Sequence, residues 1–286
     1  MISNKILNGL NGSPTIPGDK SISHRSIIIP SISNGICEVD NCLESDDVTH
    51  TINAFTAMGV KIEKQKNKIT IYGKGLNSLQ KPDNNIYLGN SGTGARLLTG
   101  LLSSQEFETT LIGDKSLSSR PMNRIVNPLK KMNAEIETKK GRMPLLIKGK
   151  KLSSASIEID IPSAQIKSGI LLAALNTKGT TNVTENNITR DHTEIMLQAF
   201  GADILVESND NKKLIKINGG KELKSQNINV PSDLSSSSFF IVAALINEKS
   251  HIIVENVNIN PTRNGILIAL KKMGARISLL NKRILN

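Results

Sequence analysis

Residues 197–202 read Leu-Gln-Ala-Phe-Gly-Ala, and this phrase decides the fold because similar phrases recur at 55–60, 129–134 and 270–275. In each one a helical pattern meets a glycine or asparagine, at positions 59, 133, 201 and 274, which are 74, 68 and 73 residues apart. These residue types adopt the left-handed conformation that ends a helix at little cost. An alternating segment follows each phrase and predicts a strand, and in two units a second strand follows. Each unit therefore contains a helix and then a β-hairpin.

A second landmark repeats with the same period at the front of each unit. A strand-like stretch meets a turn at Pro17, Gly89, Pro162 and Pro231, and these positions are 72, 73 and 69 residues apart. Small polar residues and then an apolar helix follow each turn. Two independent landmarks with one period predict an α/β fold built of units of roughly 70 residues.

Composition narrows the classes of function. The 286 residues include 36 Lys and Arg against 25 Asp and Glu, which gives a net charge of +11. The chain has seven aromatic residues and scattered lysines, so small anions are favoured over nucleic acid as ligands. No apolar run approaches the ~18 residues of a membrane span, so no membrane partner is expected. Cys37 and Cys42 cannot form a disulfide framework or a four-ligand zinc site, which favours a cytoplasmic location.

All four front turns are candidate anion sites, because a helix N-terminus presents free N–H groups and a positive dipole end. In the first turn Lys20 precedes Ser21 and Arg25, which are four residues apart and share a helix face. The second turn carries Gly92 in a glycine-rich run that lacks the Gly-Lys-Ser/Thr ending of a nucleotide P-loop. A cation, a hydroxyl and a guanidinium that converge on a helix start form a good site for phosphate or carboxylate.

The remaining turns and the placement of arginine agree with this interpretation. The third turn offers Ser163 and Gln165, and the fourth, residues 231–238, is rich in serine. The chain has 27 lysines and nine arginines, yet six of the arginines lie in or beside the special segments: Arg25, Arg96, Arg120, Arg124, Arg190 and Arg263. Arginine has a planar guanidinium that donates two parallel hydrogen bonds, so its presence at these positions of a lysine-rich chain indicates recognition of oxyanions.

Residues 189–194, Thr-Arg-Asp-His-Thr-Glu, allow two interpretations. Asp191, His192 and Glu194 are residue types that bind metals, but neighbouring residues do not share a helix face. Asp191 and Glu194 also have the spacing of a helix capping box. The capping box is therefore expected, and a metal site is not.

Seven motifs together resemble the 3-phosphoshikimate 1-carboxyvinyltransferase (5-enolpyruvylshikimate-3-phosphate synthase) family. In chain order from Pro17 to Gly265 they are PGDKSISHRS, LGNSGTGARLL, GDKSLSSRPMNR, PSAQIKSGILLAAL, TRDHTEIML, VPSDLSSSSFF and NPTRNG. The resemblance implies a two-domain enolpyruvyl transferase fold, in which each domain has three βαβαββ repeats. Six such repeats make about 420 residues, so this chain is expected to hold about four of the six and to lack about 140 residues at its C-terminus.

The same resemblance implies how the chain is divided. Residues 1–19 would supply the first strand or strands of a discontinuous domain, and residues 20–230 would form the complete three-repeat domain. Residues 231–286 would form a partial second domain that is truncated, and the fourth unit would end inside its own hairpin after a strand at 276–280.

The activity that the resemblance implies is transfer of the enolpyruvyl group of phosphoenolpyruvate to the 5-hydroxyl of shikimate 3-phosphate, with release of phosphate. This reaction belongs to the shikimate pathway, which leads to chorismate and the aromatic amino acids. The family requires no metal or other cofactor, and a monomer is expected. The family's acid/base aspartate and glutamate lie beyond Asn286, so the chain alone is expected to have little or no synthase activity.

The resemblance also assigns roles residue by residue. Lys20 matches a catalytic lysine that touches both substrates. The shikimate 3-phosphate contacts would be Lys20, Ser21, Arg25, Ser163, Gln165 and Thr189, where Thr189 stands in place of the family's usual serine. The phosphoenolpyruvate contacts would be Lys20, Gly92, Arg120 and Gln165.

Two alternatives stay open on the sequence alone. The UDP-N-acetylglucosamine enolpyruvyl transferases share the fold and phosphoenolpyruvate, but they would carry a Lys-Asn pair in the first turn and a reactive loop cysteine. Here Lys20 is followed by Ser21, and both cysteines lie early in the chain. The other alternative is a non-catalytic, anion-binding remnant of the synthase.

Overall fold

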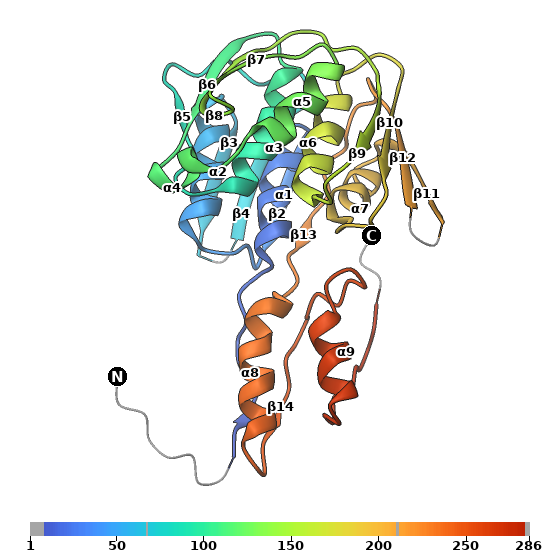
Figure 1. Ribbon diagram of the computed structural model, residues 1–286. Helices are drawn as coiled ribbons and strands as arrows, with labels where there is room; N and C mark the ends of the chain where they lie inside the picture. Colours follow the sequence, from blue (N-terminus) through green and yellow to red (C-terminus); the bar gives the residue numbers. More distant parts are fainter. Residues whose placement is uncertain (1–8, 67, 210–211, 284–286) are drawn as a thin grey trace.

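The computed structural model describes residues 9–66, 68–209 and 212–283. Three four-stranded sheets surround a set of buried helices, and the part of the chain after Pro231 extends to one side of this body (Figure 1). The α/β repeats predicted from the two landmarks are confirmed, because the three sheets share one pattern of strand pairing. In each sheet a short strand pairs in parallel with a longer one, and an antiparallel hairpin continues the sheet.

The strands of each sheet follow in their order across the sheet. The first sheet consists of β13 (Ile228–Asn229), β2 (Asn34–Asp40), β4 (Lys68–Lys74) and β3 (Lys61–Gln65). The second consists of β5 (Ile86–Tyr87), β6 (Glu108–Ile112), β8 (Arg142–Lys148) and β7 (Glu135–Lys139). The third consists of β9 (Ser156–Ile159), β10 (Thr180–Glu185), β12 (Lys212–Asn218) and β11 (Asp203–Asn209).

The first sheet is completed by a strand from the far end of the body. The sequence places the front of the first unit at residues 15–17, but that described stretch forms no strand, and β13 pairs with β2 instead. The two segments run close together, since the Asp19 N–H donates to the Pro231 carbonyl at 2.8 Å. The fronts of the first and fourth units therefore lie side by side, and the chain crosses between the body and its extension at both of them.

Three inner helices follow the front turns and fill the centre of the body: α1 (Lys20–Ser31), α3 (Gly92–Ser103) and α6 (Ala164–Ala174). Nearly all of their residues are buried, and most of these are apolar or small; the buried charged side chains, Arg25 and Lys167, lie in the first halves of α1 and α6. Helices α3 and α6 cross in direct contact, and a Cβ placed on Gly100 would lie 1.9 Å from the Gly169 carbonyl oxygen. Glycine is required at this crossing because the two backbones touch.

Gly100→Ala is expected to lower the free energy of unfolding by about 1–3 kcal/mol, because the added methyl group overlaps the backbone of α6. Urea denaturation measures the change. Gly265→Ala is the matched control, since a Cβ there meets nothing within 4 Å and alanine favours a helix. Equal stability of Gly100→Ala and the wild-type chain would show that the two helices do not touch here.

The outer helices end at the repeated phrases, as predicted. They are α2 (Asp46–Ala57), α5 (Asn123–Lys131), which the short α4 (Lys115–Ser119) precedes, α7 (His192–Ala199) and α9 (Gly265–Lys272). Gly59, Asn133, Gly201 and Gly274 have φ angles of 86°, 66°, 86° and 92°, which confirms the left-handed caps. A hairpin follows the first three caps. The strand expected at 276–280 is wrong for the described residues, because no neighbouring strand pairs with the backbone groups there.

The part after Pro231 contains α8 (Leu234–Ile246) and β14 (His251–Ile252), which pairs in parallel with β1 (Asn11–Gly12). Large apolar side chains are exposed here, among them Phe239 and Ile246 at 78% and 77%. None of the helices described is long and apolar enough to cross a bilayer. The division at residues 19 and 230 stays a prediction, and residues 1–8 and 284–286 of its outer segments lie outside the described residues.

Candidate active site

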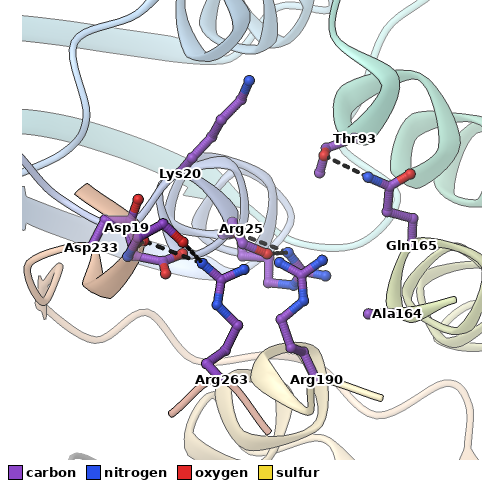
Figure 2. Close-up of a pocket in the computed structure, with 11 residues that line it drawn as sticks. Asp19, Lys20, Arg25, Thr93, Ala164, Gln165, Arg190, Asp233 and Arg263 are labelled. Carbon is purple, nitrogen blue, oxygen red and sulfur yellow. Dashed lines mark hydrogen bonds and ion pairs between the residues drawn. The ribbon is translucent and has the colours of Figure 1, made fainter. Parts of the chain in front are cut away.

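The N-termini of α1, α3, α6 and α8 converge on one pocket of about 240 Å³ (Figure 2). All four front turns singled out in the sequence therefore contribute to a single site. The residues that line the pocket are Asp19, Lys20, Ser21, Arg25, Thr93, Ala164, Gln165, Arg190, Asp233, Ser235 and Arg263. Four cationic side chains and two carboxylates face the same space, in addition to the positive ends of the helix dipoles.

The first turn is built by a cap at the start of α1. The Asp19 carboxylate accepts from the Ile22 N–H at 3.0 Å, which places the cation of Lys20 directly at the helix start. The Lys20 ammonium forms an ion pair with Asp47 of α2 and is about half exposed. In Figure 2 its side chain extends away from the two arginines that enter from the other side.

Arg25 is buried, with 2% of its surface exposed, and most of its N–H groups donate to other residues of the protein. Its Nη1 donates to the carbonyl and hydroxyl oxygens of Ser21, at 2.7 and 2.8 Å. Its Nε donates to Thr193 and its Nη2 to Ser168, both at 2.6 Å. Burial lowers the pKa of Arg25 to about 10, so it remains a cation at neutral pH. Because the Ser21 oxygen accepts from Arg25, the Ser21 hydroxyl hydrogen is free to donate into the pocket.

The second and third turns are joined by Gln165. Its Oε1 accepts from Arg96 Nη1, and its Nε2 donates to the Thr93 hydroxyl, both at 2.9 Å. The other hydrogen on Nε2 is available to a ligand. A Cβ placed on Gly92 would lie 2.8 Å from Arg120 Nη1 and 2.9 Å from Arg96 Nη1, so glycine there lets two guanidinium groups approach the start of α3.

The pocket contains Arg190 and Arg263. Both are among the six arginines that stand out in this lysine-rich sequence, but the family resemblance assigns neither of them to the site. Arg263 forms an ion pair with Asp233 at 3.3 Å and donates to the Ser235 hydroxyl at 2.6 Å. Arg190 has no hydrogen bond or ion pair to any residue that the structure describes. Only the folded chain shows that residues 190 and 263 face the same space, because they approach it from separate segments.

The predicted site residues divide into two sets. Lys20, Ser21, Arg25 and Gln165 line the pocket. The others lie beside it: Ser163 accepts from the Ile166 N–H as the cap of α6, and the Thr189 hydroxyl donates to Glu185. Gly92 begins α3, and the guanidinium of Arg120, from the end of α4, reaches it. Whether the second set touches a ligand stays a prediction.

The predicted capping box at 191–194 is wrong. Asp191 precedes α7 but makes no side-chain cap, because its carboxylate accepts from Asn260 at 2.7 Å and from Lys213 at 3.4 Å. The Glu194 side chain is 3% exposed and lies 2.7 Å from the Lys167 ammonium. Within the described part of the chain, no three His, Cys, Asp or Glu side chains gather in a way that could hold a metal ion.

A neutral histidine connects the first and second turns. His24 is fully buried, and its Nδ1 lies 2.9 Å from the Thr51 hydroxyl oxygen. Because that hydroxyl donates to the Asp47 carbonyl, the hydrogen of His24 sits on Nδ1. Its Nε2 faces the hydroxyl of Ser91, the residue that caps α3. Burial and the charge of Arg25 lower the pKa of His24 to about 3.

Stability is expected to fall as the pH drops from 6.5 toward 3, because the unfolded chain binds a proton at His24 that the folded chain excludes. From pH 7 to pH 5 this loss is about 2 kcal/mol. Urea denaturation at both pH values measures it. In His24→Asn the loss should shrink by that amount, whereas the exposed control His251→Gln should keep all of it. An unchanged loss in His24→Asn would contradict the prediction.

Comparisons with known proteins agree on one family. The family model of EPSP synthase (3-phosphoshikimate 1-carboxyvinyltransferase) matches residues 5–285. A 3-phosphoshikimate 1-carboxyvinyltransferase of Ruthia magnifica subsp. Calyptogena magnifica is 50% identical over 98% of this chain, and one of Streptococcus agalactiae serotype Ia is 49% identical over 95%.

A solved EPSP synthase from Acinetobacter baumannii is 48% identical and superposes with a TM-score of 0.90 over 96% of this chain and 62% of that one. The chain spans 63% and 64% of the length of the two curated relatives. The fold, the motifs and these matches together show that the chain belongs to the EPSP synthase family.

Proposed function

We propose that this chain forms part of an enzyme that transfers the enolpyruvyl group of phosphoenolpyruvate to the 5-hydroxyl of shikimate 3-phosphate and releases phosphate. The observation that carries the proposal is the pocket itself, where four helix N-termini and four cationic side chains face one space. Both substrates carry several negative charges, and such a site attracts them through the helix dipoles and through charge-assisted hydrogen bonds.

The pocket also has the chemistry to orient an anion. Arg190 offers a guanidinium fork that is paired with none of the described residues and that matches the two oxygens of a phosphate or carboxylate. Ser21 and Gln165 each keep a hydrogen to donate, because their oxygens already accept from Arg25 and Arg96. Donors that are held in place before the ligand arrives need little reorganisation when charge develops on it.

The chemical steps need one proton delivered to the methylene carbon of phosphoenolpyruvate and one removed from the attacking hydroxyl. Lys20 is the described residue we assign to one of these transfers, because it lines the pocket and its ammonium is paired with Asp47. Arg120, next to Gly92, would stabilise charge on the phosphoenolpyruvate side.

The ligand contacts remain proposals for this chain. For shikimate 3-phosphate they are Lys20, Ser21, Arg25, Ser163, Gln165 and the segment at Thr189, whose neighbour Arg190 lines the pocket. For phosphoenolpyruvate they are Lys20, Gly92, Arg120 and Gln165. We further propose a cytoplasmic monomer that acts on small anions rather than on nucleic acid. The family match does not favour the UDP-N-acetylglucosamine enolpyruvyl transferase alternative.

Calorimetric titration of the 286-residue chain with shikimate 3-phosphate tests the proposal. Saturable binding is expected, and shikimate without its phosphate should bind at least tenfold more weakly, because it lacks the charge that the arginines pair with. UDP-N-acetylglucosamine is the control ligand and should give no heat of binding. Absence of binding by shikimate 3-phosphate, or tighter binding of the control ligand, would overturn the proposal.

A further inference from the structure

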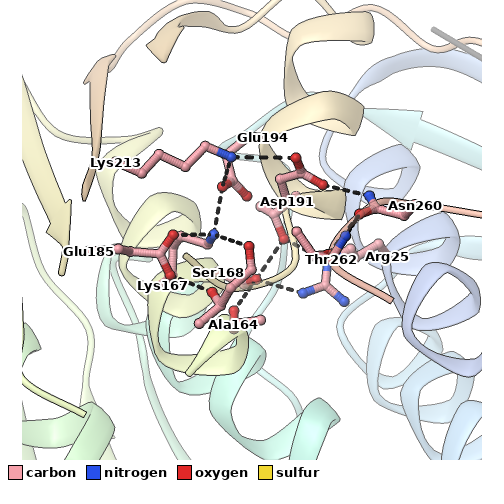
Figure 3. Close-up of polar contacts among 12 residues, drawn as sticks. Arg25, Ala164, Lys167, Ser168, Glu185, Asp191, Glu194, Lys213, Asn260 and Thr262 are labelled. Atoms are coloured by element: carbon pink, nitrogen blue, oxygen red, sulfur yellow. Dashed lines mark hydrogen bonds and ion pairs between the residues drawn. The ribbon is translucent and has the colours of Figure 1, made fainter. Parts of the chain in front are cut away.

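Figure 3 shows a cluster of charged side chains, most of them buried, together with Arg25 and Ala164 of the pocket. We name it the Lys167 network, and its members are Lys167, Glu185, Asp191, Glu194 and Lys213. The Lys167 ammonium lies 2.7 Å from both Glu185 and Glu194, and these three side chains are 0%, 1% and 3% exposed. Lys213, 8% exposed, lies 3.4 Å from Asp191 and 3.7 Å from Glu194.

Burying these charged groups costs free energy, so the cluster calls for an explanation other than stability. Removing a charge from water costs several kcal/mol, which the attraction to a partner only partly offsets, so buried ion pairs are poor stabilisers compared with apolar packing. Three carboxylates and two ammonium groups are gathered here, and the guanidinium of Arg25 is close enough to Glu194 to interact with its charge. The position of the network suggests what it does for the pocket.

The network holds the residues on both sides of Arg190. The Thr189 hydroxyl donates to Glu185, and the Lys167 ammonium donates to the Thr189 carbonyl at 3.4 Å. On the other side, Asp191 accepts from Lys213 and from Asn260. The backbone of residues 189–191 is therefore tied to buried charges at each end.

Arg190 itself has no such support. Its guanidinium lines the pocket and makes no hydrogen bond or ion pair within the described part of the chain. An unpaired arginine side chain has about 2 kcal/mol of rotamer entropy to lose when it binds an anion. Fixing its backbone on both sides is the means by which the protein can aim it.

We propose that the Lys167 network is a positioning device that presents Arg190 to the anion in the pocket, through Thr189 on one side and Asp191 on the other. This inference rests on the proposed function, since it takes shikimate 3-phosphate as the anion. It assigns the Thr189 hydroxyl to Glu185 rather than to the ligand.

Thr189→Val is the sharpest test, because it removes the hydroxyl that reaches Glu185 but leaves every buried charge paired. We expect an affinity for shikimate 3-phosphate about tenfold lower, the effect of one hydrogen bond to a charged group. Thr189→Ser keeps the hydroxyl and should bind as the wild-type chain does. Thr181→Val is the matched control on β10, since its buried hydroxyl has no hydrogen-bond partner among the described residues, and it should not change the affinity.

A double variant distinguishes a positioning role of Thr189 from direct contact of Thr189 with the ligand. If Thr189 acts through Arg190, the tenfold loss should disappear when Thr189→Val is made in an Arg190→Gln chain. An undiminished loss in that background would overturn the proposal, because the hydroxyl would then serve the ligand or the fold directly. Equal affinity of Thr189→Val and wild type in the original background would also overturn it.

A measurement without ligand keeps this inference separate from the proposed function. The NMR order parameter of the Arg190 backbone N–H group should fall toward the flexible range, below about 0.6, in Thr189→Val but not in Thr181→Val. An order parameter unchanged by Thr189→Val would overturn the positioning role. A wild-type chain that fails to bind shikimate 3-phosphate would overturn the proposed function, and the Arg190 measurement would still decide whether the network aims Arg190.

Discussion

Arg25→Ala is expected to weaken binding of shikimate 3-phosphate by about 2–5 kcal/mol, the cost of truncating a buried, hydrogen-bonded charge at a binding site. Arg25 is 2% exposed and holds the Ser21 hydroxyl at 2.8 Å. Its removal takes a cation from the pocket and frees Ser21 at the same time. Calorimetry at constant ionic strength measures the loss.

Two further variants sharpen this prediction. Arg25→Lys keeps the charge but cannot reach Ser21, Ser168 and Thr193 together, so it should also lose affinity. Arg142→Ala removes an exposed arginine on β8 and serves as the control for net charge. Equal affinities for Arg25→Ala and Arg142→Ala would remove Arg25 from the binding site.

Lys167→Met is expected to lower the free energy of unfolding by about 3–5 kcal/mol, because it leaves the buried carboxylates of Glu185 and Glu194 without their common partner. The matched control is Lys216→Met on the surface. Lys216 also lies 2.7 Å from a glutamate, Glu207, but both side chains are more than a third exposed. That variant should lose less than about 1 kcal/mol.

Urea denaturation at pH 7 compares the two lysine variants. Adding Glu185→Gln to Lys167→Met removes one unpaired carboxylate and should restore part of the lost stability. Losses of the same size for Lys167→Met and Lys216→Met would show that the Lys167 network is not shielded from water.

The sequence by itself determined the repeat and the start and end of most helices. After an apolar helix, glycine takes the left-handed conformation at little cost because it has no Cβ, and asparagine tolerates it because its side chain is short and polar, so positions 59, 133, 201 and 274 are predictable from local chemistry. The four front turns also recur in the sequence at a regular spacing, and three of them directly precede an inner helix of the body. The resemblance placed Lys20, Ser21, Arg25 and Gln165 in one site, and all four line the pocket.

Only the tertiary structure decided how these pieces meet. The first sheet takes β13 as its opening strand, the Asp191 carboxylate bonds to Asn260 instead of capping α7, and Arg190 and Arg263 face one pocket. Each of these depends on segments far apart in the chain, such as residues 40 and 229 or 191 and 260. Local residue preferences carry no information on such pairings, because their free energy arises only when packing of the core brings the segments together.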